Sequence, residues 1–123
     1  MAADEEIAPC ASDYLDGCSV RLSSSAVGEM AVDVTVDAVG IADKIGIIEI
    51  FVERKVDGEW WFYKSLDSVD HPEFYEYNSR DYLNTIYFNA ESGYTYRVTI
   101  TAYAKKGSGS DTLDLTSYSC KCK

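Results

Sequence analysis

The chain has 123 residues, a formal net charge of −10, and hydrophobic residues at 46% of its positions. This length predicts one domain, and this apolar fraction predicts a globular chain rather than a disordered one. The 11 Lys and Arg residues are scattered among 21 acidic residues, whereas nucleic acids are bound through clustered positive charge. No apolar run reaches the roughly 18 residues of a membrane-spanning helix. We therefore expect no nucleic-acid partner and no membrane insertion.

Residues 1–16 are expected to form an acidic N-terminal lead-in, and residues 17–123 one β-sandwich domain. The first six residues are acidic, whereas a signal peptide begins with a basic segment. We expect a secreted or cell-surface protein from which the signal peptide has been removed.

Four cysteines, two toward each end of the chain, are the main argument for export: Cys10, Cys18, Cys120 and Cys122. An even number of cysteines in a short exported chain predicts disulfides, and three connectivities are open. We favour two bridges that tie the N-terminal segment to the last strand, for example Cys18 to Cys120. The alternative is a zinc site made of all four thiolates, but the usual spacing of two to four residues between paired ligands is absent. We expect no metal and no cofactor.

From residue 18 onward, alternating apolar and polar residues predict strands, and no segment keeps a helical period for more than two turns. Seven strands are expected, over residues 18–23, 30–37, 47–56, 59–66, 82–90, 94–105 and 113–122. Residues 40–46 and 67–81 are expected to be connections. This pattern predicts an all-β chain folded as a two-sheet antiparallel sandwich, with a small barrel as the second architecture.

An Asp-Gly pair at 57–58 predicts a tight hairpin, because both positions of a type I′ turn need positive φ. The two-residue turn fixes the expected register, which pairs Lys55 with Trp60, Arg54 with Trp61, Glu53 with Phe62 and Val52 with Tyr63. This register places Trp61 and Tyr63 on the core face of Val52. It places three other aromatic residues on the outward face: Phe51, Trp60 and Phe62.

Residues 90–102 form a turn followed by a strand in which apolar residues alternate strictly with Thr and Arg. This segment resembles the E–F corner and F strand of fibronectin type III-like and related immunoglobulin-like domains, and residues 49–60 resemble their C–C′ hairpin. Both segments are also similar to small exported proteins of Gram-positive, often gut-dwelling, bacteria, many of unassigned function. The resemblance implies the sandwich fold. It also gives Tyr96 the structural role of closing the corner through a hydrogen bond to the preceding chain.

Candidates for catalysis and metal binding are weak. The single histidine, His71, precedes Pro72 in a long connection, and no nucleophile motif surrounds it. Acidic residues lie mostly at outward strand positions, which a solvated surface explains. Two acidic groups offer oxygens to calcium, but neither has a defined ligand spacing: Asp13 with Asp16, and Asp67 with Asp70 and Asp81. We therefore expect no enzymatic activity.

Aromatic residues are the stronger functional signal, because the chain has ten tyrosines, four phenylalanines and two tryptophans. Two clusters are candidate binding surfaces, namely the outward residues Phe51, Trp60 and Phe62, and the loop residues Phe74, Tyr75 and Tyr77. Such side chains dominate protein interfaces and stack on sugar rings. The sequence favours a monomeric, non-catalytic interaction domain that binds an extracellular protein. The alternatives are a carbohydrate-binding module, a hydrolase that uses His71, and aromatic clusters that only cover the core.

Overall fold

The computed structural model describes residues 6–9 and 12–123, with side chains from residue 12 onward. The described part of the chain contains eight strands, one short 3₁₀ helix and no α-helix. In chain order the elements are β1 (Glu6–Pro9), β2 (Leu15–Ala26), β3 (Glu29–Val56), β4 (Glu59–Asp67), η1 (Pro72–Phe74), β5 (Tyr75–Asn89), β6 (Thr95–Lys106), β7 (Gly109–Thr116) and β8 (Cys120–Lys121). All strand pairs are antiparallel. The prediction of an all-β antiparallel chain is confirmed.

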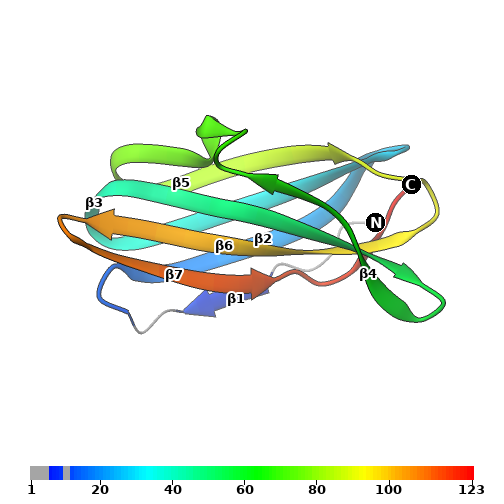
Figure 1. The fold of residues 1–123 in the computed structure, drawn as a ribbon, viewed down its shortest axis with the longest axis horizontal. Helices are drawn as coiled ribbons and strands as arrows, with labels where there is room; N and C mark the ends of the chain where they lie inside the picture. Colours follow the sequence, from blue (N-terminus) through cyan, green and yellow to red (C-terminus); the bar gives the residue numbers. More distant parts are fainter. Residues whose placement is uncertain (1–5, 10–11) are drawn as a thin grey trace.

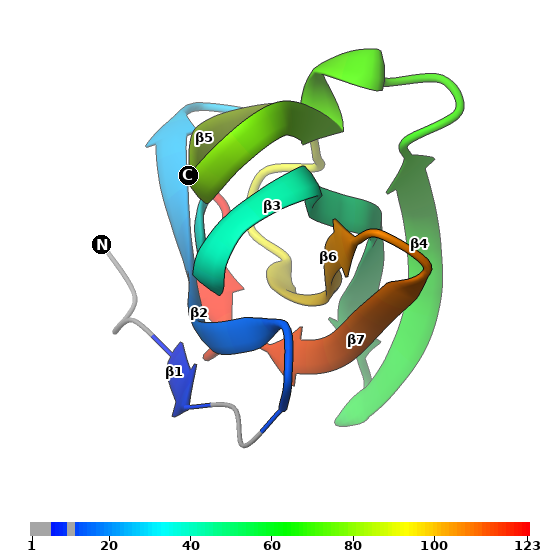
Figure 2. The ribbon, with the colours of Figure 1, turned by 90° about the vertical axis from the view of Figure 1, so that its left-hand side faces the viewer.

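The strands form one continuous hydrogen-bonded sheet in the order β1-β2-β3-β6-β7, with β4 and β5 also pairing with β3 and β8 with β6. The sheet curls so far that β1 and β2 contact β7, and the view along the long axis shows the strands surrounding a central core (Figure 2). The strand pairing therefore differs from the predicted sandwich of two sheets and seven strands. The described residues form eight strands within one curled sheet.

The single sheet follows from β3, which runs for 28 residues through the segment expected to be a connection. It pairs with β2 as far as Ala38 and with β5 as far as Gly46, and it pairs with β6 from Lys44 and with β4 from Glu49. The pairing with β5 shifts between Asp37 and Ala42, and β3 and β5 curl back together at one end of the molecule (Figure 1). Ala42 and Ile45 are buried in the core. Burial of this segment explains why the chain stays extended there instead of leaving the sheet as a loop.

The core lies inside the curl and takes alternate residues from each strand. On β6, Tyr96, Val98, Ile100 and Ala102 are fully buried, as the alternating pattern predicts. On β3, strict alternation back from the buried Ile50 and Val52 would bury Ile48, but Ile47 is buried and Ile48 is only half-buried. The cause is a register shift against β6 between residues 47 and 49, which reverses the direction of the side chains.

Three boundaries differ from the sequence-based expectation. Strand β1 pairs with β2, so part of the expected lead-in belongs to the sheet. Strand β5 begins at Tyr75, so the expected connection over 67–81 reduces to a turn and η1. The expected last strand over 113–122 is divided between β7 and β8.

Within the described residues, no helix has the length and apolar character needed to cross a bilayer.

Candidate functional site

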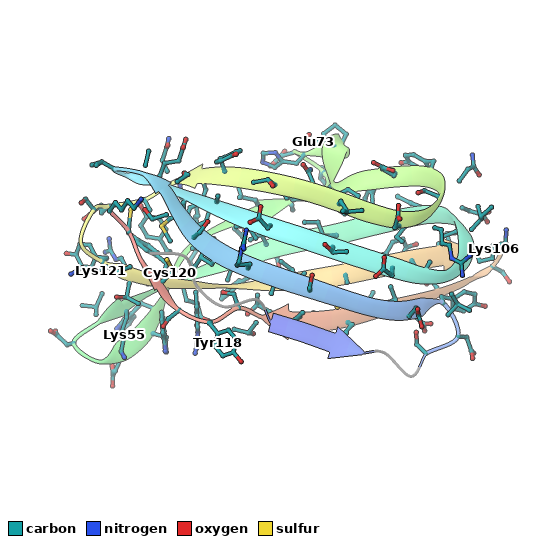
Figure 3. All side chains as sticks on the ribbon, turned by 180° about the vertical axis from the view of Figure 1, so that it is seen from behind. Lys55, Glu73, Lys106, Tyr118, Cys120 and Lys121 are labelled. Carbon is teal, nitrogen blue, oxygen red and sulfur yellow. The ribbon has the colours of Figure 1, made fainter. Side chains whose placement is uncertain are left out.

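The hairpin of β3 and β4 carries the densest group of exposed aromatic side chains. Asp57 and Gly58 have φ values of 52° and 79°, as a type I′ turn requires. The pairs predicted next to the turn are present, but a bulge then places Val52 opposite Lys64 instead of Tyr63. The tip of the hairpin, next to Lys55, extends beyond the neighbouring strands (Figure 3).

The outer aromatic cluster, defined as Phe51, Trp60 and Phe62, lies on the outward face of this hairpin. The rings of Phe51 and Phe62 are 5.1 Å apart, and Phe62 is 60% exposed. The guanidinium of Arg97 lies 4.3 Å from the Trp60 ring, and its Nε donates to Glu53 at 2.9 Å. The cluster is therefore held in place by the tilted contact between the two Phe rings and by a cation–π contact, while Phe62 faces solvent.

The opposite face of β4 differs from the expectation. Tyr63 packs edge-on against the buried Tyr96 with a centroid distance of 5.1 Å, and Arg54 lies over the rings of both Tyr63 and Tyr94. Trp61, however, is 58% exposed, although the sequence places it on the core face. It pairs with Arg54 close to the hairpin tip, beyond the strands that could cover it. Trp61 is thus a surface residue that the alternating pattern assigned to the core.

The loop cluster predicted from Phe74, Tyr75 and Tyr77 is not one surface. Phe74 is fully buried and stacks on His71 at 5.0 Å, so its assignment as a binding residue is wrong. Tyr75 is half-buried between Lys44, whose Nζ lies 4.1 Å from its ring, and Tyr103. Tyr77 is 63% exposed. Phe74 is in the core because η1 folds onto β3 at Gly46, which no local sequence pattern indicates.

The environment of His71 shows no arrangement for nucleophilic catalysis. Its Nδ1 lies 3.0 Å from the Glu73 carboxylate, and its ring stacks on Phe74. The nearby Ser68 hydroxyl donates to Tyr75 at 3.1 Å instead. Hydrogen bonds from its own backbone N–H and from His71 lower the pKa of Glu73, which favours the carboxylate form. These contacts describe a surface histidine in a turn.

The acidic residues considered as calcium ligands have other positions and roles. The Asp67 carboxylate accepts hydrogen bonds from the backbone N–H groups of Val69 and Asp70, which closes the turn after β4. Asp81 lies directly opposite Asp37. No group of three or more potential metal ligands occurs among the described residues. Burial, then the charges of Asp81 and Asp16, raise the pKa of Asp37.

The expected bridge between Cys18 and Cys120 is absent, and no disulfide joins any two of the three described cysteines. Cys120 accepts a hydrogen bond from the Ser24 backbone, so it lies beside Ser24 of β2. The N–H of Lys123, three residues later, donates to the Ser24 Oγ at 2.9 Å. Cys18 lies six residues earlier on β2, a span of about 20 Å along a strand. A disulfide needs Cα atoms within roughly 7 Å. Cys10, the fourth predicted partner, lies outside the described residues.

Tyr96 forms hydrogen bonds to the preceding chain, as expected for a residue that closes the corner. Its hydroxyl accepts a hydrogen bond from the Glu91 N–H at 2.9 Å and donates to the Glu91 carbonyl at 3.3 Å. Burial raises the pKa of this phenol, so it stays protonated and able to donate. Tyr96 thereby fixes the turn before β6, beside the aromatic hairpin.

One surface feature escaped the sequence analysis. A mostly apolar groove of about 370 Å³ lies where β3 bends, with Val39 and Ile41 exposed on its wall and Lys105 at its edge. The exposed apolar residues are separated only by Gly40, within the segment predicted to be a connection. In the sequence, the signal for this groove was the pair of aliphatic residues that flank Gly40 in a segment expected to lie at the surface.

Comparison with known proteins adds no further constraint, because no protein-family model and no curated protein sequence matches this chain.

Proposed function

We propose that this protein is an exported, non-catalytic interaction domain that binds another protein through the β4 hairpin. One observation carries the proposal: consecutive aromatic residues occupy a projecting strand, and both Trp61 and Phe62 are more than half exposed. Aromatic side chains offer large rigid contact areas at low entropic cost, and they supply most of the binding energy at many protein interfaces. The outer aromatic cluster is the centre of the proposed surface, and Trp61 extends it to the opposite face.

The charges around the hairpin support a protein partner. Arg97 and Glu53 form an ion pair, and Arg54 lies 3.5 Å from Glu91. These pairs hold the cationic groups against the aromatic rings and leave the tip near neutrality, although the whole chain carries −10. An aromatic centre within a balanced polar rim is typical of protein interfaces.

Export and the fold relationship belong to the same proposal. Four cysteines in a short acidic chain support an oxidising location. The Tyr96 hydrogen bonds to Glu91 support a relationship to fibronectin type III-like sandwiches, with the two halves of β3 acting as strands of two facing layers. The absence of a hydroxyl or thiol bonded to His71 among the described residues supports a non-catalytic role.

The test compares wild type with a Trp60→Ala, Phe62→Ala double variant on arrays of extracellular proteins and of glycans. Tyr87→Ala is the matched control, because Tyr87 is an equally exposed aromatic residue on β5. We expect protein hits that weaken by more than about tenfold in the double variant and persist in the control. Unchanged protein binding by a folded double variant would contradict the proposal. Hits confined to glycans and lost with Trp60 would establish the carbohydrate-binding alternative.

A further inference from the structure

The β4 strand leaves one side of its backbone open. It pairs with β3 alone, and no other described element pairs with its second edge. Away from the turn, Lys64 reaches across to β5, where its Nζ donates to the Asn89 carbonyl at 2.9 Å and lies 5.9 Å from the centre of the Phe88 ring. An open edge presents unpaired N–H and C=O groups that can accept another strand.

The hairpin register identifies which groups point outward. In a two-residue hairpin the residues that flank the turn, here Val56 and Glu59, form a hydrogen-bonded pair, and bonded and non-bonded pairs then alternate. Trp61 therefore directs its N–H and C=O toward β3. Trp60 and Phe62 direct theirs away from β3, to the open edge.

The four aromatic side chains on this edge include no charged residue and no proline. Natural edge strands are blocked by charged residues, prolines, inward-pointing lysines or β-bulges, and the bulge of β4 lies at Tyr63, at the end of the aromatic segment away from the turn. Here four aromatic residues stand in succession between Glu59 and Lys64 without a charge or a proline. An aromatic, uncharged edge on a projecting hairpin is suited to strand addition.

We propose that the occupant of this edge is a second copy of the same chain, whose β4 pairs antiparallel about a twofold axis at Trp61. In this register the outward N–H and C=O groups of Trp60 bond to those of Phe62 in the other copy. The twofold axis repeats this pair with the two copies exchanged. Trp61 faces Trp61 of the other copy as a non-bonded pair, in which opposing side chains lie closest. This inference rests on the proposed function, because it names the partner of the same surface.

The charge pattern favours this self-pairing. Over residues 59–63 the register places Glu59 opposite Tyr63 and Trp60 opposite Phe62, so no like charges oppose each other in the paired segment. Aromatic residues meet only aromatic residues at the centre, which is a favourable cross-strand combination. The dimer replaces the monomer expected from the sequence.

The test is sedimentation equilibrium of the full chain from micromolar to millimolar concentration, with three variants. Trp61→Lys places two ammonium groups face to face across the axis, whereas Tyr87→Lys makes the same change on β5 at equal exposure. Phe62→Pro removes an outward N–H and leaves the ladder to β3 intact. Near-ultraviolet circular dichroism establishes that each variant is folded.

We expect wild type and Tyr87→Lys to dimerise alike, and Trp61→Lys and Phe62→Pro to raise the dimer dissociation constant more than tenfold. A wild type that stays monomeric at millimolar concentration would overturn the self-pairing. A dimer that persists in folded Trp61→Lys would overturn it as well, because another surface would then mediate association. The proposed function fails by a different result. It fails if the folded monomer binds proteins on the array and this binding does not depend on Trp60 and Phe62.

Discussion

The hydroxyl of Tyr96 connects the core to the turn before β6. Tyr96 is fully buried, yet its hydroxyl both donates to and accepts from the Glu91 backbone. A partly buried N–H that loses its acceptor keeps part of the cost of desolvation without compensation. Tyr96 therefore couples the packing of the core to the conformation of the turn that precedes β6.

We expect Tyr96→Phe to lower the free energy of unfolding by about 1 kcal/mol, because the Glu91 N–H loses its partner while ring packing is retained. Urea denaturation measures the change. Tyr87→Phe, on an exposed tyrosine, serves as the control and is expected to leave stability unchanged. Equal stability of wild type and Tyr96→Phe would show that the hydroxyl contributes nothing to the corner.

Asp37 provides a pH-dependent prediction. Its folded-state pKa is raised, first by burial and then by Asp81 and Asp16. The folded state therefore holds the Asp37 proton more tightly than the unfolded state, so this carboxyl reduces stability as pH rises through its folded pKa. We expect Asp37→Asn to increase the free energy of unfolding at pH 7 by at most about 1 kcal/mol, the upper size of a cross-strand pair effect, because Asp37 is exposed and solvent screens the repulsion.

The increase should shrink as pH falls below the folded pKa and vanish well below about 3.9, the pKa of an ordinary aspartate. Thermal denaturation between pH 3 and 7 measures this profile. The Asp81→Asn variant should give a similar increase, and the double variant should gain less than the sum, because each change removes the same repulsion. A gain that is independent of pH would rule out a charge effect.

At the scale of elements, the packing of η1 against β3 depends on one glycine. Gly46 has a φ of +155°, and a Cβ at this position would overlap the carbonyl oxygen of Phe74 in η1. The close approach lets η1 fold onto the strand and carry Phe74 into the core. A side chain here would separate η1 from β3.

We expect Gly46→Ala to lower the free energy of unfolding by about 1–3 kcal/mol through backbone strain, with the clash against η1 in addition. Gly40→Ala is the matched control on the same strand, because a Cβ there meets nothing within 4 Å. Chemical denaturation compares the two. A stable Gly46→Ala protein that retains its near-ultraviolet circular dichroism would contradict the close packing of η1.

The hairpin shows how far sequence reasoning reaches at this scale. The Asp57-Gly58 turn needs positive φ at both positions, so the register of the first pairs could be derived from two residues. The bulge that follows could not, because aromatic residues on both faces of β4 give no alternation that a shift would break. The exposure of Trp61 was missed for a related reason: alternation assigns a face, but only the length of the neighbouring strands decides whether that face is covered.

Long-range packing decided the other differences. Gly40 indicates a turn by local rules, yet the burial of Ala42 and Ile45 keeps β3 extended through the bend. Phe74 is locally indistinguishable from its tyrosine neighbours and becomes a core residue through η1. Cys18 and Cys120 were paired by their places at the two ends of the chain, but β2 and β8 hold them far apart along the strand.

At the scale of the whole molecule, net charge opposes association while the hairpin favours it. Each copy carries −10, so two copies repel at long range. The contacts between paired β4 strands are aromatic and backbone contacts, which salt screens little. Association should therefore strengthen as ionic strength rises, whereas an interface built from ion pairs would weaken.

We expect the dimer dissociation constant to fall severalfold between low ionic strength and about 0.5 M salt, because screening shortens the Debye length to a few ångströms. Sedimentation equilibrium over a salt series measures this dependence. Weaker association at high salt would indicate that attraction between charged groups holds the dimer.

Amide hydrogen exchange resolved by nuclear magnetic resonance shows whether the open edge of β4 is a binding edge. In dilute protein, we expect slow exchange at Trp61, whose N–H faces β3, and fast exchange at Trp60 and Phe62. At concentrations where the protein associates, exchange at Trp60 and Phe62 should slow at least tenfold while Trp61 stays protected. Fast exchange at both positions in the associated protein would show that no strand pairs with this edge.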